Sequence, residues 1–135
     1  MGIRTRLAVL ACKTSNAVLR RMGRGGTNLP GKIALKIDKD ILKELSRGVK
    51  VTVVTGTNGK TTTNNMLCAA IEKEGYKVIC NHTGSNMLNG VVAAFVLGAG
   101  FSGNLDADYA CIEIDEASTV RVLPYFKPDY MILTN

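Results

Sequence analysis

From position 49 onward, short apolar runs alternate with segments that carry apolar residues at helical spacing. The apolar runs are rich in β-branched residues, which is typical of buried strands, and they cover 49–55, 76–81, 109–115 and 130–135. The helical patterns between them cover 60–74, 91–97 and 117–126. Strands separated by helices indicate βαβ crossovers. The pattern therefore predicts an α/β fold, with a mainly parallel sheet and helices on both faces.

The first 48 residues have a different pattern. Apolar and small residues recur at spacings of three and four and predict one stripe of a helix: Ile3, Leu7, Leu10, Ala11, Thr14, Val18 and Met22. "GRGGTNLPGK" should break this helix, and "KIALKI" at 32–37 alternates like a short strand. Asp38 can cap a further helix over 39–48 that stops at Gly48. We expect a helical lead-in over 1–48 and a main domain over 49–135.

Positive charge is concentrated in this lead-in. The net charge is +6, yet residues 1–37 contain eight Lys or Arg and no acid, which leaves the other 98 residues slightly negative. Such a helix can contact an anionic membrane surface, although an apolar stripe at helical spacing usually packs as core. Membrane contact and core packing are compatible if the stripe faces the protein and the arginines face the membrane. We expect no nucleic-acid partner.

The cysteines indicate a reducing environment. Four of them lie far apart in the sequence, and none belongs to a C-x-x-C pair. Only "LAVLAC" resembles the apolar part of a signal peptide, and no clear cleavage site follows it. No segment approaches the roughly 20 apolar residues that a membrane span needs. We expect buried, reduced thiols and a cytoplasmic protein.

The stretch "VTVVTGTNGKTTT" at 51–63 carries the clearest chemistry. Glycines after a strand let several backbone N–H groups face one anion, and the next helix adds the positive end of its dipole. The predicted ATP-binding residues are Gly56, Thr57, Asn58, Gly59, Lys60, Thr61 and Thr62. Lys60 would clamp the phosphates, and the Thr61 hydroxyl would bind Mg²⁺.

The loop is shorter than the general P-loop. It reads G-x-x-G-K-T, because the position five before Gly59 is Val54 and not glycine. The alternative interpretation is a glycine turn with an incidental lysine, but the strand before and the helix after favour a phosphate site. A dinucleotide loop would require G-x-G-x-x-G, which this stretch lacks. We therefore expect a P-loop-like sheet.

A second set of polar residues follows a strand in "YACIEIDEAS". Strand alternation would put Glu113 and Asp115 on one face and Glu116 on the other. Carboxylates suit Mg²⁺, which keeps several waters and accepts one or two protein oxygens. The alternative is that these acids merely begin an exposed loop.

Several segments together resemble the Mur ligase superfamily. Its ATP loop reads G-T-[NSG]-G-K-[ST], and Thr61 with Thr62 favours the peptidoglycan enzymes over folylpolyglutamate synthases, whose loop continues G-K-G-S. The sequence is most similar to the branch that forms the ATP-dependent subunit of lipid II isoglutaminyl synthase. Nearly the whole chain takes part, through "IRTRLAVL", "LPGK", "VTGTNGKTTT", "NHTGSNMLNGV", "IEIDEAS" and "PDYMILTN".

The resemblance implies roles for individual residues. Lys60 and Glu113 would be catalytic, with Glu113 the preferred Mg²⁺ ligand and Asp115 the second candidate. In "NHTGSNMLNG", the side chains that would reach the γ-phosphate and the acyl phosphate are Thr83, Ser85 and Asn86, with Asn86 preferred. His82 is the only histidine, and a lone histidine in a polar loop is more often simply solvated.

The resemblance also implies an activity. The complete enzyme would use ATP and Mg²⁺ to activate the α-carboxylate of D-glutamate in lipid II, and a GatD-type glutaminase in a heterodimer would supply ammonia. The alternatives are another amino acid ligase of the superfamily and a non-catalytic nucleotide-binding module. The chain is expected to be the front part of such an enzyme and not active alone, because the rest of the ATPase sheet, a zinc ribbon and a C-terminal domain have no counterpart here.

Overall fold

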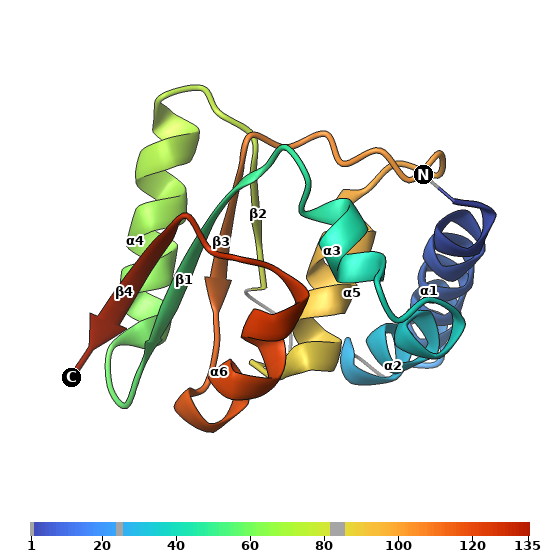
Figure 1. The fold of residues 1–135 in the computed structure, drawn as a ribbon, viewed down its shortest axis with the longest axis horizontal. Coiled ribbons are helices and arrows are strands. Elements are labelled where there is room, and N and C mark those ends of the chain that lie inside the picture. Colours follow the sequence, from blue (N-terminus) through green and yellow to red (C-terminus); the bar gives the residue numbers. More distant parts are fainter. Residues whose placement is uncertain (1, 24–25, 82–85) are drawn as a thin grey trace.

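The computed structural model describes residues 2–23, 26–81 and 86–135. In this part of the chain four strands form one sheet, with neighbours in the order β2-β3-β1-β4 (Figure 1). The strands are β1 (Lys50–Gly56), β2 (Val78–Cys80), β3 (Tyr109–Glu113) and β4 (Tyr130–Thr134). Every neighbouring pair is parallel, which confirms the predicted parallel α/β sheet.

Helices cover both faces of this sheet (Figure 1). One face carries α4 (Lys60–Lys73), and the other carries α5 (Leu88–Gly98) and α6 (Glu116–Val122), which continues into the 3₁₀ helix η1 (Leu123–Tyr125). The lead-in forms α1 (Ile3–Arg21), α2 (Asn28–Ile37) and α3 (Ile41–Leu45). Of these, α1 and α2 lie beyond α5 as seen from the sheet, and α3 contacts both α5 and α1, so the lead-in covers that face (Figure 1).

The main core lies between the sheet and the α5 layer. Val53 and Ile112 contribute from the sheet, and Phe95 contributes from α5, all without solvent exposure. Each such side chain stabilises the fold by about 1.5–3 kcal/mol through burial. The same cluster includes Val9 and Ile41 of the lead-in, so residues 1–48 and the sheet share one core.

The predicted strand at 32–37 is wrong, because this segment is the second half of α2. The buried residues of α2 are Pro30, Gly31 and Ala34, whose spacing is helical. Pro30 is tolerated because it lies in the first turn, where its missing N–H is not needed. At Gly31 a Cβ would lie 1.8 Å from the backbone oxygen of Asn89, so glycine permits close packing of α2 on α5.

The prediction that the apolar stripe of the first helix packs as core is also wrong. The buried residues of α1 are Thr5, Ala8, Val9 and Cys12, which lie on the opposite side of the helix. Small side chains there let α1 approach its neighbours closely, and Thr5 Oγ1 donates a hydrogen bond to Asp38 Oδ2 at 2.7 Å. The larger aliphatic residues of the predicted stripe are consequently left exposed, at Ile3, Leu7, Leu10, Val18 and Met22.

The third helix is shorter than predicted. It begins after Asp40 and not after Asp38, whose Oδ1 accepts a hydrogen bond from Asp40 N at 3.0 Å. Asp38 itself ends α2, so one residue stops a helix and braces the turn to the next. Gly48 has a φ of 81°, which suits the turn into β1.

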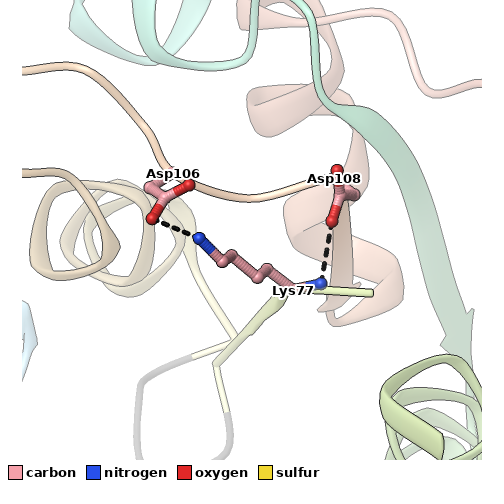
Figure 2. A network of polar contacts seen from close by, with 3 residues as sticks. All are labelled: Lys77, Asp106 and Asp108. Carbon is pink, nitrogen blue, oxygen red and sulfur yellow. Dashed lines mark hydrogen bonds and ion pairs between the residues drawn. The ribbon is translucent and has the colours of Figure 1, made fainter. Parts of the chain in front are cut away.

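Figure 2 shows how the start of β2 is tied to the segment before β3. Lys77 N donates to Asp108 Oδ2 at 2.9 Å, and Lys77 Nζ pairs with Asp106 Oδ2 at 2.6 Å. The hydrogen bond to Asp106 raises the pKa of Lys77. Both partners are largely exposed, so this ion pair contributes little to stability. It aligns two neighbouring strands where the chain enters them.

None of the four cysteines forms a disulfide, and Cys12, Cys68 and Cys111 are buried while Cys80 is half-buried. Burial raises the pKa of the Cys12 thiol to about 11. No helix in the described ranges has the length and apolar character needed to cross a bilayer.

Candidate nucleotide-binding site

The glycine loop begins where the central strand β1 ends. Because the strands are parallel, their carboxyl ends meet at one edge of the sheet, where α/β proteins commonly bind ligands. Gly56 has a φ of 132°, and a Cβ there would lie 2.2 Å from the backbone oxygen of Thr134 in β4. Only glycine fits this position, so the chain turns out of the sheet directly beside β4.

The loop ends at Gly59, which has a φ of 77° and occupies the N-cap of α4. The first turn of a helix leaves N–H groups without intrahelical partners, and these carry the positive end of the dipole. The first turn of α4 contains no acid and begins with Lys60. Thr62 is exposed on this same turn. The arrangement favours an anion at the start of α4.

Lys60 folds back over the loop. Its Nζ donates to Gly56 O at 2.6 Å and to Thr57 O at 3.2 Å. The ammonium group therefore lies over the glycine loop, on the same turn as the free helix N–H groups. Thr57 Oγ1 donates to Glu116 Oε1 at 2.9 Å, which ties the loop to α6. Asn58 N donates to Asn135 O at 2.7 Å.

Glu113 is the meeting point of three elements. Its side chain is 7% exposed, and its Oε1 accepts hydrogen bonds from Thr61 Oγ1 at 3.1 Å and from Asn86 Nδ2 at 2.8 Å. Thus β3, α4 and the segment before α5 converge beside the start of α4. The structure brings together three predicted site residues that lie 25 or more positions apart in the sequence.

A carboxylate beside a threonine hydroxyl is a donor set that suits Mg²⁺. Among the described residues, no group of three or more His, Cys, Asp or Glu side chains could hold a metal. Mg²⁺ commonly takes only one or two protein oxygens and completes its shell with water and phosphate. Thr61 and Glu113 would supply these two protein oxygens.

Asp115 is less directly placed. The strand ends at Glu113, and Asp115 occupies the N-cap of α6, so strand alternation does not extend to it. Its backbone N–H donates to Asn86 O at 3.2 Å. The role of Asp115 in metal binding stays a prediction. The candidates Thr83 and Ser85, together with His82, lie outside the described residues.

Sequence reasoning missed Asn81, which directly follows β2. Its Nδ2 donates to Glu113 O at 2.8 Å, and its Oδ1 accepts from Glu113 N at 2.9 Å. Asn81 is 5% exposed, so both hydrogen bonds are shielded from water. The sequence signal that could have identified Asn81 is an asparagine at the carboxyl end of a parallel strand. Asn81 braces the backbone of Glu113, while Thr61 and Asn86 hold the Glu113 carboxylate.

The sequence is similar to proteins that share one name, although no family model matches it. The chain is 44% identical over 136 aligned positions to "Lipid II isoglutaminyl synthase (glutamine-hydrolyzing) subunit MurT" of Streptococcus pneumoniae, across 100% of this chain and 30% of that protein. It is 42% identical over 130 positions to the protein of the same name from Staphylococcus aureus, across 96% of this chain and 28% of that protein.

The chain therefore spans about 30% of the length of the curated relatives it matches. It resembles the N-terminal part of MurT, which confirms the predicted resemblance.

Proposed function

We propose that this chain provides the ATP-binding part of a lipid II isoglutaminyl synthase. The observation that carries the proposal is the Glu113 carboxylate, held by Thr61 and Asn86 beside the N-terminus of α4. The likeness to MurT proteins supplies the chemical context. The location would be the cytoplasm, at the inner face of the membrane.

The loop residues would bind and orient the nucleotide. Backbone N–H groups at the start of α4 and the Lys60 ammonium would offset charge on the phosphates. Glu113 and Thr61 would hold Mg²⁺, which when bound would neutralise further phosphate charge. Asn86 lies against Glu113 at 2.8 Å and would be close to the terminal phosphate.

The reaction would have two steps. A carboxylate oxygen of the D-glutamyl residue attacks the γ-phosphorus of ATP, so that ADP leaves and an acyl phosphate forms. Ammonia then attacks the acyl carbon, phosphate departs with that oxygen, and loss of a proton gives the amide of D-isoglutamine. A glutaminase subunit of the GatD type would supply the ammonia, in keeping with the words "glutamine-hydrolyzing" and "subunit" in the names of the relatives.

The test uses the full-length protein together with its glutaminase subunit. Lipid II, Mg-ATP and glutamine should give an amidated product in mass spectrometry, and a heavy-oxygen label in the carboxylate should appear in the released phosphate. Lys60→Ala should abolish the product. Lys73→Ala, at the exposed far end of the same helix, should leave product formation unchanged.

Other results would contradict the proposal in distinct ways. Addition of an amino acid in place of ammonia would identify a different ligase of the superfamily. Binding of Mg-ATP without turnover by the complete complex would identify a non-catalytic nucleotide-binding module.

A further inference from the structure

The outward face of α1 carries large aliphatic side chains in solvent. We call Ile3, Leu7, Leu10 and Val18 the α1 stripe; their exposed fractions are 77%, 55%, 48% and 56%. At 3.6 residues per turn these four residues lie within an arc of roughly 80°. The opposite side of the helix, with Ala8 and Cys12, packs against the protein. The α1 stripe is therefore an apolar surface that the described chain leaves uncovered.

Exposed arginines surround the α1 stripe. Helical geometry places Arg4 on one side of it, Arg6 and Arg20 on the other, and Arg21 in line at its C-terminal end, and all four are exposed. Lys13 is engaged elsewhere, since its Nζ donates to Ala99 O and lies 4.9 Å from the centre of the Phe101 ring.

The neighbouring helices offer little negative charge to balance these arginines. The sequences of α1, α2 and α5 contain no Asp or Glu, and α2 adds Lys32 and Lys36. Asp38, the first acid in the chain, is half-buried, and its Oδ2 accepts a hydrogen bond from the Thr5 hydroxyl. Of the helices packed against α1, only α3 carries an acid, Glu44.

We propose that the α1 stripe is a docking surface for an anionic lipid bilayer, with α1 lying in the plane of the interface. Aliphatic side chains would enter the boundary of the acyl chains, while the flanking arginines would reach the headgroup phosphates. This inference adds to the proposed location the surface that would contact the membrane, and it uses no residue of the nucleotide site, so the two can fail separately.

Charge distinguishes this occupant from the other candidates. A second copy of the chain, docked stripe to stripe, would bring arginines of one α1 against arginines of the other, which is repulsive. A protein partner would need a rim of acids that matches both sides of the stripe. A bilayer with anionic lipids presents negative charge along the whole helix, whichever way the helix is rotated about the membrane normal.

The test is flotation of the full chain with vesicles of phosphatidylcholine, with and without phosphatidylglycerol. Binding should require phosphatidylglycerol and should weaken as salt is added. The double variant Arg6→Gln, Arg20→Gln should lower the partition coefficient by about fivefold for each charge removed. The double variant Leu7→Ser, Leu10→Ser should also reduce binding, because it removes apolar surface that enters the interface.

Matched controls remove similar groups from other helices and surfaces. Lys73→Gln with Lys127→Gln removes two exposed charges, and Met66→Ser with Val120→Ser removes exposed apolar side chains of α4 and α6. Both controls should float like the wild type. Equal flotation of the stripe variants and the controls would overturn the proposal. So would a dimer in solution that Leu7→Ser, Leu10→Ser abolishes, combined with no binding to either kind of vesicle.

Discussion

The side chain of Asn81 spans the backbone of Glu113, donating to its carbonyl oxygen at 2.8 Å and accepting from its N–H at 2.9 Å. This pair joins the end of β2 to the end of β3 at the edge of the sheet that carries the glycine loop. These two hydrogen bonds fix the backbone from which the Glu113 carboxylate projects toward Thr61. Both the stability of the fold and the binding of the metal are therefore expected to depend on Asn81.

Asn81→Ala should destabilise the fold by about 1–3 kcal/mol, because it leaves a buried donor and a buried acceptor of Glu113 without partners. Thermal unfolding measures the loss. Asn104→Ala, at an exposed asparagine, is the matched control and should change stability little. Mg-dependent nucleotide affinity should fall only in the Asn81 variant. A stability equal to that of the control would contradict the bracing role.

Glu113→Gln should raise the Mg²⁺ requirement more than the nucleotide requirement. The substitution preserves the shape of the side chain and an oxygen that can accept from Thr61, but it removes the charge that the metal needs. Titration calorimetry with ATP at several Mg²⁺ concentrations should show weakening of metal binding by about tenfold or more. Asp115→Asn should have the smaller effect. The reverse order would identify Asp115 as the main metal ligand.

Gly56→Ala should destabilise the protein more than Gly59→Ala does. Both glycines have positive φ, which costs an alanine about 1–2 kcal/mol. Only at Gly56 would the added methyl also collide with Thr134, at 2.2 Å from its backbone oxygen. Urea denaturation gives the two values, and Gly100→Ala is the control because that glycine has no positive φ and an added Cβ would make only ordinary contacts, at 3.6 Å. Equal losses at Gly56 and Gly59 would show that the contact with β4 is unimportant.

Cys12 should make stability depend on pH at the alkaline end. Burial raises the pKa of its thiol from 9.0 to about 11, so the folded state holds this proton more tightly than the unfolded state does. The stabilising contribution is complete below pH 9.0 and is lost as the pH rises toward about 11. Denaturation of wild type and Cys12→Ala across this range isolates the effect. Parallel pH profiles for the two proteins would refute it.

Much of the nucleotide site was predictable because its signals are local. The β-branched residues at 51–55 favour an extended strand, and the glycines after them permit the turn. Lys60 then lies at the start of the next helix. The parallel order follows from the helix between successive strands, since such strands need a crossover. Each of these inferences uses neighbours within one βα unit.

The partners of Glu113 could not be predicted in the same way. Thr61, Asn81 and Asn86 are distant from it in the sequence, and they meet only because three chain segments end at one edge of the sheet. The strand expected at 32–37 failed for a related reason. Alternation of apolar residues there is compatible with two periods, and close packing of Gly31 on Asn89 selected the helix.

By itself, then, the sequence determined the α/β order of elements and the chemistry of the loop, because both depend on local backbone preference and hydrophobic period. Only the tertiary structure decided which side of α1 faces the protein. Both sides carry apolar residues, and helical spacing cannot rank them. Packing can, because Ala8 and Cys12 allow a closer approach than Leu7 and Leu10 do. The larger side chains therefore remain outside, beside the arginines.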